Sequence, residues 1–220
     1  MQLYCREGKT LNFKFVMLVL LTLFWTIAYI FAVIYAVRNK THAIPPLSIS
    51  LNFSWEIIAF FYYFEFIDIA WVIVDFFIVA LIVDEFIEKQ YKKGWLYIIS
   101  FLCYGIVCAG LFNETFPDGT TGYIFLSFAM DLIMAIDFNL EFHEKQREKV
   151  VDGSLFWIAI FKFLGDAVAL IIYRMYPSVL AFGVAVFFFN LIYIVRVYKE
   201  LLKSPSQRKG AKYGGRHIRW

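Results

Sequence analysis

The sequence predicts an all-α membrane protein built as a bundle of seven transmembrane helices. Three observations support this prediction. First, 61% of the 220 residues are hydrophobic and 21% are aromatic, which is more apolar surface than a soluble domain of this length needs. Second, the apolar residues fall into seven runs, each close to the length of about 20 residues that a helix needs to cross a bilayer. Third, the basic residues between the runs are shared very unevenly between the two sides.

Short polar breaks separate most of the runs, and several breaks carry a recognisable helix or turn signal. In chain order the runs are 13–37, 47–66, 67–87, 95–112, 123–140, 154–173 and 178–198. Pro45 and Pro46 precede the second run and Pro177 precedes the seventh, where a proline is tolerated because the first amide hydrogens of a helix have no helical partner. The stretch NETFPDGTTG predicts a turn between the fourth and fifth runs.

The basic residues predict the orientation of the bundle. With seven spans, four of the Lys and Arg residues belong to the N-terminal side and sixteen to the other side, while Lys162 lies inside the sixth run. Because cytoplasmic loops carry the excess of Lys and Arg, the N-terminus is expected outside and the C-terminus in the cytoplasm. Residues 1–203 then form the membrane domain, and residues 204–220 form a basic, disordered tail near anionic headgroups.

Polar side chains within the runs are the main functional signal, because hydrocarbon penalises charge and such groups mark sites in membrane proteins. Five of them lie about 11 to 18 Å below the outer ends of five different runs, given the helical rise of 1.5 Å per residue. These five residues are Glu56, Asp75, Asp131, Asp166 and Asn190. The pattern predicts one shared polar layer, whereas Asp137 lies deeper and is interpreted, with Glu141, as an interfacial group.

This layer has two interpretations. Its members can be interhelical contacts that fix packing, and Lys162 with Asp166, four residues apart on one helix, is a candidate pair. Alternatively, the layer surrounds a cavity in which burial keeps a carboxyl group protonated, which makes Glu56 a candidate proton donor. Asn52 lies one helical turn before Glu56, and aromatic side chains such as Tyr193 would stabilise a cation.

Two motifs on the second and third runs resemble a known family. N-x-x-W-E, here Asn52, Trp55 and Glu56, is followed by E-x5-W-x3-D, here Glu65, Trp71 and Asp75. This pattern resembles the small seven-helix integral-membrane terpene cyclases of meroterpenoid and indole-diterpene pathways. The resemblance implies that Glu56, with an aspartate on the last helix, protonates an epoxide or alkene of a polyprenyl chain, which then cyclises through cations without a metal.

One residue departs from the family pattern. Asn190 stands where the resemblance predicts the last-helix aspartate, and an amide cannot supply that carboxylate. Asp75, Asp131 or Asp166 can take its role, or the chemistry differs. The predicted site therefore comprises Glu56, Asp75 and Asp166 as catalytic candidates. The substrate-binding candidates are Asn52, Trp55, Trp71, Asp131, Asn190 and Tyr193.

The alternative function is a small-molecule transporter with a polar site near the bilayer midplane, although the chain shows no internal repeat. A retinal protein would need a lysine deep in the last run, which has none. His42, His143 and His217 are predicted in loops or in the tail, and EFHEKQREK is interpreted as a solvated charge run. No metal-binding spacing occurs, so no metal or other cofactor is expected. The expected partners are the bilayer and a lipophilic substrate, with no nucleic acid.

Overall fold

A computed structural model of the chain is helical wherever it describes regular structure. It describes residues 2–63, 66–88 and 120–203, together with the isolated positions 99, 102, 105, 106 and 110. The helices are α1 (Gln2–Asn39), α2 (Pro46–Tyr63), α3 (Phe66–Glu88), α5 (Thr120–Glu148), α6 (Gly153–Tyr173) and α7 (Pro177–Leu202). No strand occurs among the described residues, which confirms the all-α class. Most of the fourth predicted run and all of the tail at 204–220 lie outside the described residues.

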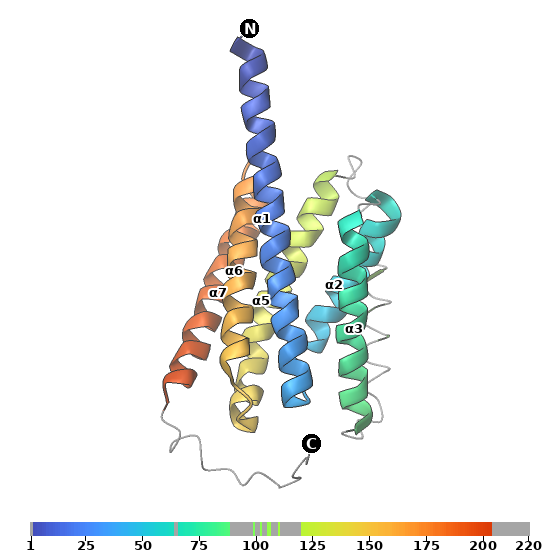
Figure 1. Ribbon diagram of the computed structural model, residues 1–220, viewed down its shortest axis with the longest axis vertical. Coiled ribbons are helices and arrows are strands. Elements are labelled where there is room, and N and C mark those ends of the chain that lie inside the picture. Colours follow the sequence, from blue (N-terminus) through green and yellow to red (C-terminus); the bar gives the residue numbers. More distant parts are fainter. Residues whose placement is uncertain are drawn as a thin grey trace.

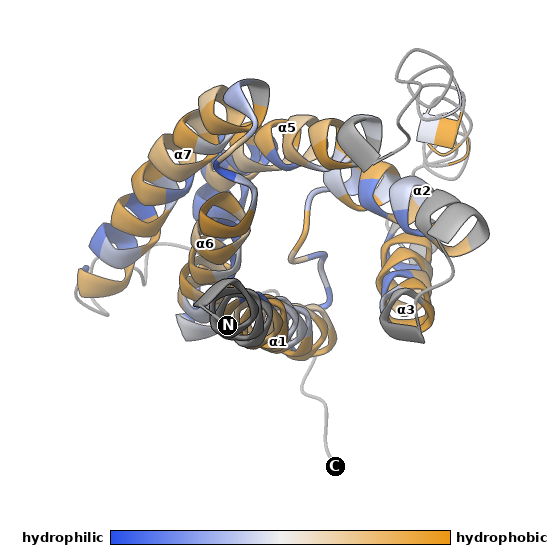
Figure 2. Cartoon of the chain, turned by 90° about the horizontal axis from the view of Figure 1, so that it is seen from above, coloured by the Kyte–Doolittle hydropathy of each residue, from blue (hydrophilic) through white to orange (hydrophobic). Residues whose placement is uncertain are grey.

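The helices lie side by side as a bundle, and α1 extends beyond the others at its N-terminal end (Figure 1). Seen from above, α1 lies next to α6 and α2 lies next to α3, while α5 packs against α2, and α7 packs against both α5 and α6 (Figure 2). Five helices, α1, α2, α3, α5 and α6, therefore surround one region of the bundle, and α7 lies outside that group.

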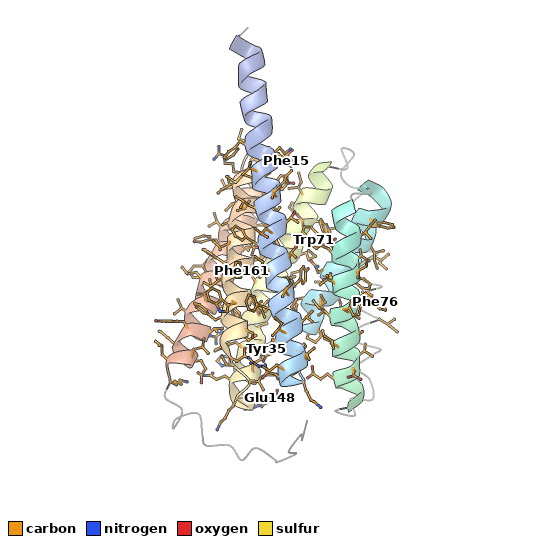
Figure 3. The ribbon with its side chains drawn as sticks, viewed as in Figure 1. Phe15, Tyr35, Trp71, Phe76, Glu148 and Phe161 are labelled. Atoms are coloured by element: carbon orange, nitrogen blue, oxygen red, sulfur yellow. The ribbon has the colours of Figure 1, made fainter. Side chains whose placement is uncertain are left out.

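Three of the described helical segments are long and apolar enough to cross a membrane: Phe13–Asn39, Gly153–Tyr173 and Val179–Leu202. Large apolar side chains also point away from the bundle, as Phe76 does on the outer side of α3 with 60% of its surface exposed (Figure 3). Exposure of so much apolar surface to water is unfavourable. These features indicate association with a membrane.

The helix boundaries follow the local signals in the sequence. Helix α2 begins at Pro46 and α7 at Pro177, as predicted. Asp152 caps α6, because its carboxylate accepts hydrogen bonds from the backbone amides of Ser154 and Leu155 at 2.8 and 3.4 Å. Helix α1 ends where Lys40 adopts a left-handed conformation, with φ of 51°, and the chain turns there towards α2.

The fifth helix continues beyond the predicted apolar run at 123–140, because α5 extends to Glu148 and includes the charged stretch EFHEKQREK up to that residue. His143 therefore lies on a helix and not in a loop. The helix continues because Glu141 and Lys145 pair at 3.6 Å, one turn apart, and because Phe142 is buried against Tyr193. The stretch is also not fully solvated, since Lys145 is only 4% exposed.

Close packing joins α1 to α6. Gly165 of α6 allows this approach, because a Cβ atom there would lie 2.7 Å from the indole ring of Trp25. At the other end of α1, the Tyr35 hydroxyl donates to the carbonyl of Val150 at 3.0 Å, and the Asn39 amide donates to Asp152 at 2.9 Å. These contacts hold α1 beside α6 along one side of the polar interior.

Candidate functional site

A cavity of about 640 Å³ lies between α1, α2, α3, α5 and α6. Six of the residues predicted for the site line this cavity. They are Asn52, Trp55, Glu56, Trp71, Asp131 and Asp166. Phe15, which Figure 3 labels, and Val19 of α1 also line it and are 67% and 50% exposed, so the cavity reaches the apolar surface of the molecule near that end of α1.

Helix α2 places the first polar group of the cavity wall. Asn52 and Glu56 are one helical turn apart and share a face of α2, and both are buried, with exposures of 4% and 3%. The Asn52 amide donates one hydrogen bond to the Tyr29 hydroxyl and another to the Asp75 carboxylate, each at 2.6 Å. Both amide hydrogens are thus used, so Asn52 is held in place beside Glu56 by α1 and α3.

Helix α6 places the second polar group. The ammonium group of Lys162 lies 2.5 Å from Asp131 and 2.6 Å from Asp166, which confirms the predicted pair within α6 and adds a carboxylate from α5. The Lys162 ammonium also lies 5.1 Å from the centre of the Trp25 ring, an attractive cation–π distance. Lys162 is not part of the cavity wall, whereas both of its aspartates are.

Several buried polar atoms of this region have no hydrogen-bond partner among the residues that the structure describes. They are Asp75 Oδ1, Asp166 Oδ1 and the indole nitrogen of Trp71. Because buried polar groups in folded proteins are nearly always paired, such atoms call for an explanation. Trp71 and Asp166 belong to the cavity wall, but these two atoms themselves are covered by neighbouring groups.

Three predicted site residues lie outside the cavity wall. Asp75 contacts the wall residues Asn52 and Tyr29 but does not line the cavity itself. Asn190 of α7 donates to Asp166 Oδ2 at 2.5 Å, so it supports a cavity residue without lining the cavity itself. Tyr193 packs edge-on against Phe138 and Phe142, one turn further along α7. Helix α7 lies behind α5 and α6 as seen from the cavity, which explains why its residues do not reach it.

Sequence reasoning missed the contribution of α1. Trp25 and Tyr29 line the cavity and contact Lys162 and Asn52, respectively. They lie four residues apart in the first apolar run, with ring centres 6.0 Å apart. The first run has no carboxylate, and this aromatic pair at helical spacing is the one signal that its sequence offers for a place in the site.

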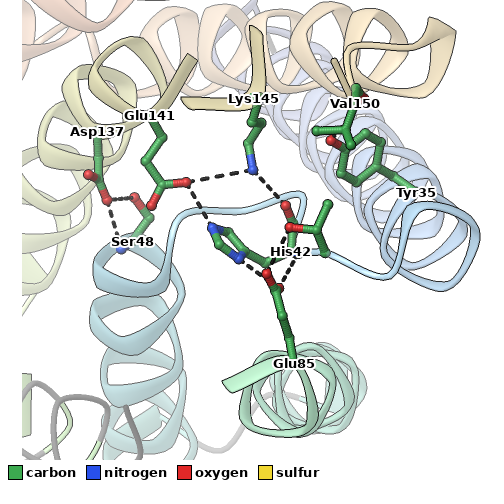
Figure 4. A network of polar contacts seen from close by, with 9 residues as sticks. Tyr35, His42, Ser48, Glu85, Asp137, Glu141, Lys145 and Val150 are labelled. Atoms are coloured by element: carbon green, nitrogen blue, oxygen red, sulfur yellow. Dashed lines mark hydrogen bonds and ion pairs between the residues drawn. The ribbon is translucent and has the colours of Figure 1, made fainter. Parts of the chain in front are cut away.

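A second polar cluster, which we call the His42 cluster, joins the α1–α2 loop to α3 and α5 (Figure 4). Its members are Thr41, His42, Glu85, Glu141 and Lys145. His42 Nδ1 lies 2.8 Å from Glu85, and His42 Nε2 lies 3.0 Å from Glu141. Glu85 also accepts from Thr41 and from the backbone amide of His42, while Lys145 donates to the His42 carbonyl at 2.6 Å.

The acidic groups of the His42 cluster favour the charged form of His42, and His42 in turn favours the charged form of Glu141. Burial alone lowers the pKa of His42, but its hydrogen bonds with Glu141 and Glu85 outweigh burial and raise the pKa above the ordinary histidine value. Burial likewise raises the pKa of Glu141, yet contact with His42 and Lys145 brings it below its usual range. The raised pKa of His42 favours the doubly protonated imidazole, which can donate to both carboxylates.

A metal site is not apparent in the described part of the chain, where no three His, Cys, Asp or Glu side chains converge in a suitable group. Comparison with known proteins adds no further assignment. No family model matches the chain, and neither a curated protein nor a solved structure is significantly similar to it.

Proposed function

We propose that the protein is a membrane-embedded, acid-initiated terpene cyclase. The proposal takes the chain as a seven-span integral membrane protein with its N-terminus outside and its C-terminus in the cytoplasm. The observation that carries it is the cavity of about 640 Å³, in whose wall a buried carboxyl group, Glu56, stands among aromatic side chains. Such a cavity has room for a folded isoprenoid chain, and most of its lining surface is apolar.

Glu56 is the proposed proton donor. In an apolar cavity the neutral carboxylic acid is favoured over the carboxylate, so Glu56 can deliver its proton to an epoxide oxygen or an alkene carbon. Protonation of an epoxide breaks one carbon–oxygen bond and leaves a positive charge on carbon, which a neighbouring alkene attacks to close a ring. Loss of a proton to a base ends the sequence and leaves a neutral product.

The aromatic residues of the wall suit this intermediate. Trp25, Trp55, Trp71 and Phe128 line the cavity, and each aromatic face can stabilise a nearby cation by roughly 0.5–2 kcal/mol. Water attacks carbocations, so an apolar wall also protects the ring-closing steps.

The second carboxylate of the proposed reaction is Asp166. Asn190, where the family resemblance predicts an aspartate, donates a hydrogen bond to Asp166 at 2.5 Å. A carboxylate from α6 therefore lies next to the position in α7 that lacks one. Asp166 can receive the final proton, with Asp75 assigned to positioning Asn52 beside the acid.

The test uses membranes that contain the protein, supplied with an epoxidised prenyl-aromatic compound. We expect cyclised product from the natural sequence and a large loss with Glu56→Gln, which keeps the shape of the side chain but cannot donate the same proton. Asp84→Asn, an exposed carboxylate on α3, is the control and is expected to leave turnover unchanged. Equal turnover by Glu56→Gln and the natural sequence would remove Glu56 from the mechanism.

A transporter is the second candidate, and the observation that favours it is the buried group of Lys162, Asp131 and Asp166. Ionisable clusters of this kind mark ion and proton routes in membrane proteins. Vesicle uptake driven by a proton gradient, without chemical change of the compound taken up, would support transport and contradict the cyclase proposal.

A further inference from the structure

The face of α1 that lines the cavity changes from exposed to buried along the helix. Most of its residues recur at intervals of three or four, which places them on one side of α1. They are Phe15, Leu18, Val19, Thr22, Trp25, Thr26 and Tyr29. Phe15 and Val19 are 67% and 50% exposed, whereas Tyr29 is only 4% exposed. One continuous surface of α1 therefore leads from the outside of the molecule into the cavity.

The exposed end of this face lies within the segment of α1 that is long and apolar enough to cross a membrane. That segment is Phe13–Asn39, so Phe15 and Val19 lie about 3 and 9 Å beyond its first residue along the helix axis. Lys14 is exposed, and lysines near the end of a span extend towards the headgroups. The opening at Phe15, Leu18 and Val19, which we call the α1 opening, therefore faces hydrocarbon when α1 is in the bilayer.

The wall opposite α1 is also mainly apolar at this end of the bundle. Helix α5 begins at Thr120 and α6 ends at Tyr173, both on the side of the N-terminal half of α1 (Figure 1). The residues that α5 and α6 add to the wall there are Ile124, Phe128, Ala169 and Tyr173. An apolar entrance offers water few hydrogen bonds, whereas it suits a hydrocarbon chain.

The α1 opening and Glu56 belong to different parts of the cavity. The Asn52 amide donates to the hydroxyl of Tyr29 at 2.6 Å, and Tyr29 is at the buried end of the α1 face. Asn52 and Glu56 are one helical turn apart on α2, so Glu56 also lies towards that end. A ligand that enters at Val19 therefore crosses mainly apolar surface before it meets the acid.

We propose that the α1 opening is a lateral entrance, through which a lipophilic ligand passes into the cavity from the membrane leaflet on the N-terminal side of α1. The route selects molecules that carry a long apolar chain and are already dissolved in the bilayer, because the ligand never has to cross water. This inference rests on the proposed function in treating α1 as a membrane span and the cavity as the ligand site, but it concerns the route and not the reaction.

The first test uses a long-chain alkyl diazirine, which dissolves in the bilayer and, on illumination, labels the side chains that it contacts. The full-length protein is placed in lipid nanodiscs, and labelled residues are identified by mass spectrometry. We expect label on Tyr29 and Trp71 in the cavity, and on Phe76 on the outer side of α3. Photoactivatable leucine in the buffer should label neither cavity residue. Lipid-phase label on Phe76 alone, or equal labelling of the cavity by the aqueous probe, would overturn the proposal.

Val19 and Val16 form a matched pair for obstructing the opening. They are 50% and 52% exposed on α1, but Val19 lines the cavity and Val16 does not. Val19→Trp should slow the labelling of Tyr29 on the order of tenfold, because the chain has to pass a crowded site, and Leu18→Trp should act in the same way. Val16→Trp and Val19→Ala should keep the natural rate. Label on Phe76 calibrates each variant.

The variants also decide against the proposal if they behave alike. Equal labelling of Tyr29 in Val19→Trp, Leu18→Trp and Val16→Trp would show that the ligand does not pass the α1 opening. Both valines are about half exposed, so their replacement leaves the packed interior unchanged and folding is expected to survive.

The outcome is separable from that of the cyclase test, because labelling needs no chemical conversion of a substrate. If cavity labelling depends on Val19 but no compound is ever cyclised, the lateral entrance stands and the cyclase proposal fails. If cyclisation depends on Glu56 but proceeds equally fast in Val19→Trp and Val16→Trp, the cyclase proposal stands and the lateral entrance fails.

Discussion

The cavity region and the His42 cluster both bury acidic side chains beside a lysine, but they pair these groups differently. In the His42 cluster, both ring nitrogens of His42 face carboxylates, and Glu85 and Lys145 have several partners each. In the cavity region, Asp166 Oδ1, Asp75 Oδ1 and the Trp71 indole nitrogen have none among the described residues. A saturated network holds elements together, whereas an unsaturated one can bind a ligand.

The cluster and the cavity should therefore respond differently to mutation. Changes in the cavity should alter activity more than stability, and changes in the His42 cluster should do the reverse. Single substitutions in each region should reveal this difference.

Glu56→Gln should reduce cyclisation on the order of 10³-fold, because a positioned general acid contributes 10²–10⁴-fold. The midpoint of thermal unfolding in detergent should change little, since glutamine fills the same volume. Product formation and unfolding are measured on the same preparation. A folded Glu56→Gln protein with full activity would contradict the assignment of Glu56 as the proton donor of the cavity.

His42→Leu should destabilise the protein by about 2–4 kcal/mol, because it leaves Glu85 and Glu141 without the cation between them. The matched control is His143→Leu, since His143 lies exposed on α5 beside Arg196 and should contribute less than about 1 kcal/mol. Chemical denaturation in one detergent measures both. The specific activity of the folded fraction should be retained, and equal losses of stability in the two variants would contradict the assignment.

Gly165→Ala should destabilise the protein by about 1–3 kcal/mol, because the added methyl group would lie 2.7 Å from the Trp25 ring and force a shift at a packed interface. Gly153→Ala is the matched control, as nothing lies within 4 Å of the Cβ that it would add. Thermal unfolding compares the two. If Gly165→Ala is neutral while ligand affinity is also unchanged, the close contact of α1 with α6 does not shape the cavity.

The smallest effect expected is a pH dependence. Because the pKa of folded His42 lies above its ordinary value, folding favours the protonated ring. The stabilisation is complete below the unfolded pKa of about 6.5 and is lost as the pH rises through the folded pKa. Glu85, Glu141 and Lys145 face the ring and set this shift. The temperature midpoint of unfolding should fall with rising pH above about 6.5 in the natural sequence. In His42→Gln this midpoint should depend less on pH.

Local sequence signals predicted the elements of the fold well. The helix starts at Pro46 and Pro177 follow from the missing amide hydrogen of proline, and the Lys162–Asp166 pair follows from helical spacing. The polar layer was also visible, because residues such as Glu56, Asp131 and Asp166 interrupt apolar runs at similar depths. These features depend only on neighbours within one helix or on the lengths of the helices.

Contacts between helices could not be predicted in this way. The partners of Asn52 are Tyr29 and Asp75 from two other helices, Asn190 supports Asp166 from outside the cavity, and Lys145 is buried although its stretch reads as solvated. Each depends on how a helix is rotated about its axis and which helix lies beside it. Spacing along the chain determines which residues share one face of a helix. Packing of the whole bundle determines which residues that face contacts.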